Sequence, residues 1–203
     1  MDRRSVLVGA ASLLAGCGSF GAVADDRVDE TVTPAPVPSP EPTETDPRRR
    51  FAGEFCPQFD RRTDQSVCGH AQSPDSALRF TTDRAVAVLA DSRLTRPLRT
   101  TLSWSLEGEL AVFARSWYLL RETESGWTQV ANPTRRESVV RIDDGERLHW
   151  LVDTVPHDTG DDTVSVVAPL DPGRYAFVVQ TVGGQSRLHT ECIALFDVVS
   201  WDG

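Results

Sequence analysis

Lysine is absent from this sequence of 203 residues, asparagine occurs once, and Met1 is the only methionine. No apolar run reaches the roughly eighteen residues of a membrane-spanning helix, so no such helix is predicted. All 21 basic residues are arginine, and the 30 acidic residues give a formal net charge of -9. A polyanion is repelled by this charge, so nucleic acid is not a predicted partner.

The motifs that identify common enzyme classes are also missing. The chain has no Gly-x-Ser-x-Gly elbow, no phosphate-binding glycine loop and no His-Glu-x-x-His zinc motif. Its many acidic residues are interchangeable in pattern, so no pair can be nominated for glycoside cleavage. We therefore predict that the protein is not an enzyme, and we nominate no catalytic residue and no cofactor.

The surface composition is distinctive. Asp outnumbers Glu by 19 to 11, and an acidic, lysine-free surface keeps a protein hydrated through charge repulsion. This composition resembles that of proteins from salt-loving archaea. A bacterium with a GC-rich genome is the alternative source.

Residues 1–16 are predicted to be an export signal, because Arg3 and Arg4 precede a short apolar run. Leu14-Ala15-Gly16-Cys17 resembles a lipobox, the motif after which lipoproteins are cut and carry lipid on the cysteine sulfur. The resemblance implies lipidation at Cys17 and attachment to the membrane without spanning it. The alternative is an ordinary secretory signal. The arginine pair also resembles a twin-arginine signal, which leaves the export route open.

Residues 17–50 are predicted to be a disordered, acidic Pro/Thr linker that follows the lipidated cysteine. Six of the twenty residues from Val28 to Pro47 are proline and four are threonine. Such a composition cannot build a core and favours extended conformations. Arg48, Arg49 and Arg50 end the linker, and we interpret them as a solvated charge run, with a binding patch as the alternative.

Residues 51–203 are predicted to form one all-β domain. Apolar and polar residues alternate with period two, and turn signals are frequent, which favours an antiparallel β-sandwich. Gly183-Gly184-Gln185-Ser186 is predicted to be a hairpin turn. Strands are expected at 98–106, 117–122, 127–130, 148–152, 174–182 and 188–199.

A local pattern refines the predicted fold. Leu170-Asp171-Pro172-Gly173-Arg174-Tyr175, together with Trp117-Tyr118-Leu119-Leu120 and Gly126-Trp127, resembles bacterial immunoglobulin-like domains of surface lipoproteins. The resemblance covers about residues 98–199 and implies an immunoglobulin-like sandwich. It also implies that Tyr175 bonds back across the corner before its strand. These are fold motifs, so they imply no activity.

Three cysteines follow Cys17, namely Cys56, Cys68 and Cys192. In an exported protein a pair usually forms a disulfide, and we predict one between Cys56 and Cys68. The alternative is that Cys192 pairs with one of them. Cys192 shares strand parity with apolar neighbours, so we interpret it as a small buried residue.

A metal site is the sharper alternative for the same residues. Cys56, Cys68, His70 and Cys192 could together provide four soft ligands for a tetrahedral zinc ion. Their spacings match no strong zinc motif, so no metal is predicted.

These features predict a lipid-anchored protein on the extracellular face of the cell membrane, serving as an interaction or structural module. Its partner would be an envelope protein or a glycan. Trp127 is the tryptophan most expected to be exposed, and could anchor such a partner, although we prefer to place it at the edge of the sandwich. The alternative function is a small metal- or thiol-dependent redox protein using Cys56, Cys68, His70 and Cys192.

Overall fold

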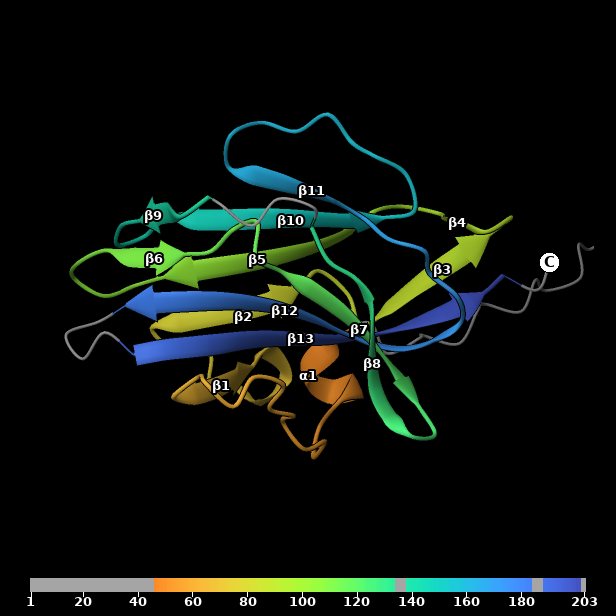
Figure 1. Cartoon of the computed structure of the whole chain (residues 1–203), viewed down its shortest axis with the longest axis horizontal. Coiled ribbons are helices and arrows are strands. Elements are labelled where there is room, and N and C mark those ends of the chain that lie inside the picture. The colour runs from red at the N-terminus through yellow and green to blue at the C-terminus, as the bar shows by residue number, and fades with distance from the viewer. Residues whose placement is uncertain (1–45, 134–137, 184–187, 202–203) are drawn as a thin grey trace, which may run out of the picture. The chain divides into compact units, whose positions relative to one another are not determined.

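Two β-sheets packed face to face make up most of the described chain (Figure 1). The computed structural model describes residues 46–133, 138–183 and 188–201. The four-stranded smaller sheet consists of β2 (Leu78–Thr82), β5 (Leu98–Trp104), β10 (Arg147–Asp153) and β11 (Thr163–Val167). The nine-stranded larger sheet consists of β1 (Gln65–Cys68), β3 (Val86–Ala90), β4 (Arg93–Leu94), β6 (Leu110–Val112), β7 (Tyr118–Thr123), β8 (Gly126–Ala131), β9 (Val140–Ile142), β12 (Gly173–Gly183) and β13 (Leu188–Ser200).

The predicted all-β sandwich is confirmed, but its sheets are mixed rather than purely antiparallel. Three strand pairs are parallel: β1 with β13, β3 with β13, and β10 with β11. Period-two alternation identifies a strand and its buried face, but it carries no information on the direction of the neighbouring strand. Parallel neighbours are not joined by a hairpin, so no local turn signal marks them.

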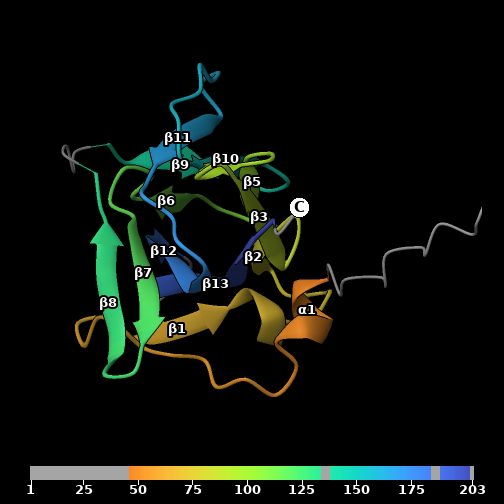
Figure 2. The ribbon, with the colours of Figure 1, turned by 90° about the vertical axis from the view of Figure 1, so that its right-hand side faces the viewer.

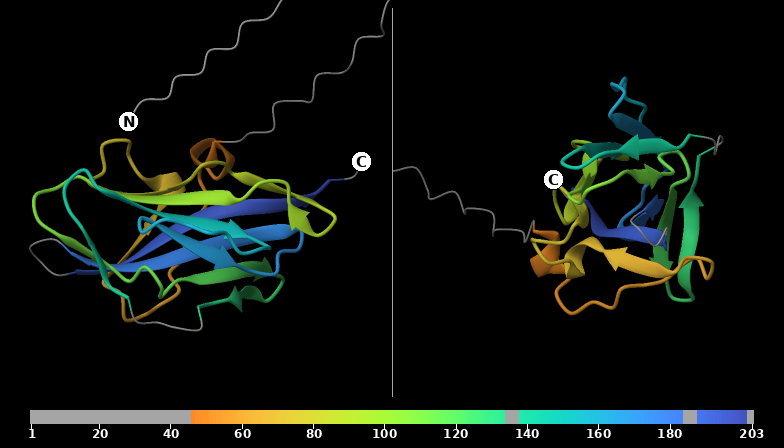
Figure 3. Two further views of the ribbon diagram at one scale, coloured as in Figure 1. Left: turned by 90° about the horizontal axis from the view of Figure 1, so that it is seen from above. Right: turned by 90° about the vertical axis from the view of Figure 1, so that its left-hand side faces the viewer.

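The long strands β12 and β13 run side by side along the larger sheet (Figure 3). They pair antiparallel, with Gly183 opposite Leu188. This pairing agrees with a hairpin, but Gly184, Gln185 and Ser186 of the predicted turn lie outside the described part of the chain. β13 is buried on both faces along most of its length, and its buried residues include the polar side chains of Thr190, Glu191 and Asp197.

Aromatic side chains fill the inner core, the cluster of buried residues between the two sheets. Trp150 on β10 lies edge-on to Phe80 and Phe177, with ring centroids 5.8 and 6.0 Å apart. The indole Nε1 of Trp150 donates to the carbonyl oxygen of Ala114 at 2.9 Å, so its only polar group is satisfied. Trp104 is likewise buried.

The N-terminal cover, residues 46–71, packs over the outer face of the larger sheet and also contributes β1 to that sheet (Figure 2). It contains α1 (Pro47–Arg50), β1 and the short 3-10 helix η1 (Gly69–Ala71). Phe51 is fully buried and packs with Ala176, Val178 and Ile193. We call this second cluster of buried residues the outer core.

The predicted linker ends earlier than residue 50, because 46–50 belong to the folded cover. The side chain of Asp46 caps α1 by accepting from the Arg48 amide at 2.9 Å, and Pro47 occupies the first turn. Arg50 pairs with Asp197 on β13 at 2.7 Å. This partner is 147 residues away in sequence, so the local composition could not indicate it. Residues 17–45 of the predicted linker, and the predicted signal 1–16, lie outside the described residues.

No helix in the described ranges is both long and apolar enough to cross a membrane.

Candidate functional site

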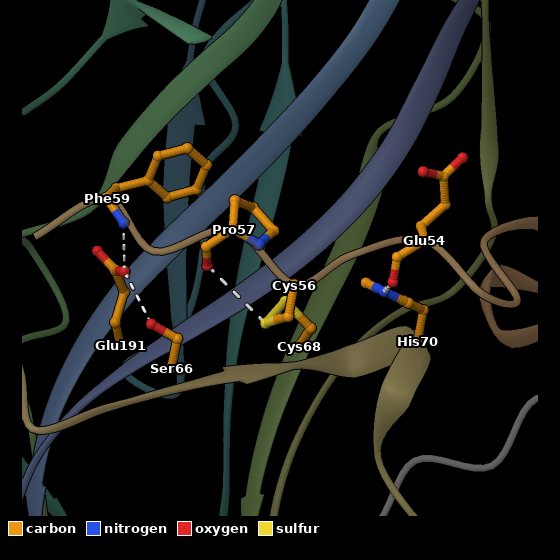
Figure 4. Close-up of a disulfide and its surroundings, with 8 residues drawn as sticks. All are labelled: Glu54, Cys56, Pro57, Phe59, Ser66, Cys68, His70 and Glu191. Carbon is orange, nitrogen blue, oxygen red and sulfur yellow. Dashed lines mark hydrogen bonds between the residues drawn. A yellow bond between two sulfur atoms is a disulfide. The ribbon is translucent and has the colours of Figure 1, made fainter. Parts of the chain in front are cut away.

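The disulfide that joins Cys56 to Cys68 closes the N-terminal cover (Figure 4). The two Cα atoms are 5.7 Å apart, and the S–S distance is 2.11 Å. Cys68 ends β1, where it lies opposite Ile193 in the parallel register with β13. The predicted disulfide is confirmed, and it fixes the loop between the two cysteines to a strand of the larger sheet.

A buried carboxyl group lies beneath this loop. Glu191 on β13 is fully buried, and its Oε2 accepts hydrogen bonds from the Phe59 amide at 2.9 Å and the Ser66 hydroxyl at 3.3 Å (Figure 4). Its Oε1 has no hydrogen-bond partner among the described residues. Burial raises the pKa of Glu191, and the two hydrogen bonds oppose that rise. Sequence reasoning missed this residue, because nothing distinguishes it from the other acids of the chain.

Tyr175 makes the contact that the corner pattern implies. Its hydroxyl donates to the Asp171 carbonyl at 2.8 Å and accepts from the Asp171 amide at 2.9 Å. The ring stacks on Phe196 with centroids 5.4 Å apart, and burial raises the pKa of the phenol. Tyr175 therefore fixes the turn that leads into β12, which is a structural role.

The alternative metal ligands do not converge. Cys56 and Cys68 are bonded to each other, and the Nε2 of His70 lies 3.2 Å from the Glu54 carbonyl. Cys192 belongs to the inner core, on the opposite face of β13 from Cys68. Within the described ranges no group of three or more His, Cys, Asp or Glu side chains is arranged to hold a metal ion.

The thiol of Cys192 is buried, as predicted. Burial raises its pKa to about 12, so it is almost entirely protonated at neutral pH. A reactive cysteine needs a stabilised thiolate and access to solvent, and this one has neither. The redox alternative thus lacks both its ligand set and its reactive thiol.

Trp127 lies at the edge of the outer core. It is half-buried, and its ring meets Phe59 of the cover edge-on with centroids 5.5 Å apart. This placement agrees with the interpretation of Trp127 as a residue that covers the edge of the sandwich. The expectation that it is the most exposed tryptophan was wrong, because Trp201 is 68% exposed.

A cavity of about 420 Å³ opens where the cover meets the edge of the smaller sheet. Its walls come from α1, η1, β2 and β13. The charged and polar residues that line it are Asp46, Arg48, His70, Arg79, Thr81, Thr82 and Asp83. Small-molecule sites typically have volumes of roughly 300–1,000 Å³, so the cavity has the size of a binding site.

Unpaired polar atoms are concentrated around this cavity. Seven buried side-chain polar atoms lack a hydrogen-bond partner in the described residues, and four belong to residues that line it. They are Arg48 Nη2, His70 Nδ1, Arg79 Nε and Thr82 Oγ1. Buried polar groups are normally paired, so a cluster of exceptions needs an explanation.

The two carboxylates of the cavity are already engaged. Asp83 accepts from Arg84 at 2.9 Å and lies 3.6 Å from Arg96. One carboxylate oxygen of Asp46 accepts the hydrogen bond from the Arg48 amide that caps α1. The guanidinium groups of Arg48 and Arg79 have no side-chain partner in the described part of the chain. Arg48 and Arg79 therefore bring two guanidinium groups without an ion-pair partner among the described residues to the wall of one cavity.

Gly69 determines how closely η1 approaches the smaller sheet. A Cβ atom at this position would overlap the carbonyl oxygen of Phe80, so only glycine permits the contact. The close approach places His70, the next residue, beside β2. The adjacent disulfide at Cys68 holds the same segment from the other side.

The prediction that Arg48 is a solvated charge was wrong, because its guanidinium is half-buried in the cavity wall. Sequence reasoning missed Arg79 and Thr82 altogether. The only available signal was their position on a strand that begins soon after the Cys68-Gly69-His70 motif.

No protein-family model matches this chain, and no curated protein matches its sequence.

Proposed function

We propose that the protein is a lipid-anchored interaction module on the outer face of the cell membrane, without enzymatic activity. The observation that carries this proposal is the disulfide between Cys56 and Cys68. Disulfides form and persist in oxidising compartments and are rare in the cytosol. The disulfide thus supports the export that the arginine pair and apolar run at residues 1–16 predict.

In this proposal Cys17 carries the lipid, residues 17–45 connect it to the folded unit, and the sandwich is displayed at the surface. The sandwich would be immunoglobulin-like, a proposal that the hydroxyl contact of Tyr175 supports. Its partner would be an envelope protein or a glycan. The acidic, lysine-free composition supports an origin in a salt-loving archaeon.

Intact mass and protease accessibility test the anchor and its location together. Wild-type protein extracted from membranes with detergent should begin at residue 17 and carry the mass of a lipid. Cys17→Ser should carry no lipid mass, and Cys192→Ala, which replaces another cysteine, should keep it. Protease added to intact cells should remove the wild-type domain from the surface.

Two results would contradict the proposal. The first is wild-type protein without lipid mass on Cys17. The second is a domain that resists protease until the cells are lysed, because it would then face the cytoplasm.

A further inference from the structure

We propose that the cavity between the cover and β2 binds an oxoanion, namely a carboxylate, sulfate or phosphate group of a small solute. Arg48 and Arg79 would hold this group. The proposal deepens the binding role proposed above and rests on it, because it names a ligand class for the same module. The cavity lies within the folded unit and is independent of the lipid anchor, so binding there can be tested separately.

The arginines of the folded unit differ in whether they pair with a carboxylate. Acids outnumber arginines in this chain by 30 to 21, and several arginines of the folded unit pair with a carboxylate. Arg50 and Arg174 pair with Asp197, for example, and Arg84 pairs with Asp83. Arg48 and Arg79 have no such partner among the described residues, yet both line one cavity.

Each of the two guanidinium groups has one nitrogen that is both shielded from solvent and unpaired, Nη2 in Arg48 and Nε in Arg79. Removing a donor from water without giving it an acceptor is unfavourable. Those two nitrogens are out of reach of a solute in the cavity, so an anion there would bind the remaining N–H groups of the two guanidinium groups and balance their unpaired charge.

A guanidinium group is planar and presents its N–H donors as a fork, which matches two oxygens of one oxoanion. A halide ion offers no such pair of oxygens. The cavity volume of about 420 Å³ also exceeds what a bare ion would fill, so we assign the site to an oxoanion carried by a small solute.

His70 restricts further the class of solute that fits the cavity. Its Nε2 lies 3.2 Å from the Glu54 carbonyl, which can only accept, so Nε2 carries the proton. In the neutral ring Nδ1 is therefore an acceptor, and it is unpaired. Thr82 adds a free hydroxyl. This set favours a solute that carries a hydroxyl group beside its oxoanion, as a sugar acid does.

Isothermal titration calorimetry on the full chain in detergent, at constant sodium chloride, tests the site. The probes are sodium sulfate, sodium phosphate and sodium glucuronate, each titrated alone. Wild-type protein should bind at least one of them saturably with one site per chain. Strongest binding by glucuronate would identify an organic acid as the source, and strongest binding by phosphate or sulfate an inorganic ion.

Three matched variants each remove one positive charge. Arg48→Gln and Arg79→Gln should weaken binding by about ten- to a hundredfold, because each removes a charge-assisted contact. The control is Arg49→Gln, which changes an exposed neighbour in α1 and should leave the affinity unchanged. Thermal midpoints without ligand and the mass of the intact disulfide establish that each variant is folded.

Two outcomes would overturn the proposal. One is the absence of saturable binding of all three oxoanions by a folded wild-type chain. The other is an equal loss in Arg49→Gln, which would mean that diffuse positive charge attracts the anion. Either result would leave the lipid mass on Cys17 unaffected, so the failure of this proposal is distinct from failure of the anchor.

Discussion

The two faces of β13 are buried by different kinds of contact. Toward the smaller sheet, Cys192 and Phe196 join the broad inner core, which contains apolar side chains from both sheets. Toward the cover, Ile193 packs in the smaller outer core, while Glu191 and Asp197 on the same face bind polar groups of the cover. Apolar burial is the main stabilising term in folding, so the inner core should be the more stable side.

From this difference we expect the cover to open before the two sheets separate. The cover is joined to the rest of the larger sheet by the parallel pairing of β1 with β13, the small outer core and a few charged contacts that are partly exposed, while the disulfide links two segments of the cover itself. Ion pairs of this kind contribute little, about 0–1 kcal/mol each. Regions with few apolar contacts open locally before the rest of a protein unfolds.

Truncation in the inner core should destabilise the protein most. Phe177→Ala removes a ring that packs against Phe80, Trp117 and Trp150, and should lower the free energy of unfolding by about 3–5 kcal/mol. Denaturant unfolding followed by tryptophan fluorescence measures this loss. Phe51→Ala, the same truncation in the outer core, should cost less global stability. Equal losses would mean that the two cores unfold as one.

Loss of the disulfide should have the next largest effect, a loss of stability in the cover. Replacing both Cys56 and Cys68 by serine opens a loop of about 13 residues, which the chain-entropy model values at about 3 kcal/mol. Hydrogen exchange should accelerate in residues 46–71, while amides of β5 and β10 keep their protection. Faster exchange in all strands alike would contradict the comparison between the two faces.

A smaller effect concerns pH. Burial raises the pKa of Glu191, so the folded state holds its proton at pH values where the unfolded state, with a pKa of about 4.3, has lost it. Stability therefore falls as pH rises from that value through the folded pKa. Glu191→Gln should remove this dependence and add about 1 kcal/mol at neutral pH, because no charge is then buried. Denaturant midpoints across the acidic to neutral range measure it, and an unchanged slope would contradict it.

Much of the inner half of the molecule was predictable from local patterns. Alternation along β5 indicates a strand with one apolar face, and strand parity placed Cys192 in the core. The disulfide followed from the short separation of Cys56 and Cys68 in an exported chain. Each of these features depends on residues close together in sequence.

The outer half was not predictable, because its contacts join distant residues. Arg50 and Asp197 are 147 positions apart, and Phe59 and Glu191 are 132 apart. Arg48 resembles its neighbours in a run of three arginines, and only the folded cover distinguishes it by placing it in the cavity wall. A single sequence offers no pattern that pairs one arginine with one acid among thirty.

The reactivity of Cys192 tests the difference between the two faces of β13 without a change in stability. Its raised pKa of about 12 and its place in the inner core predict that a thiol reagent leaves it unmodified in the native protein. The thiol introduced by Ser200→Cys, an exposed position on the same strand, should react readily and serves as the control. Reagent mass on each cysteine, read after timed labelling, gives both rates. Labelling of Cys192 at a rate near the control would mean that the inner face of β13 opens as easily as the covered face, and the difference between the two cores would then be lost.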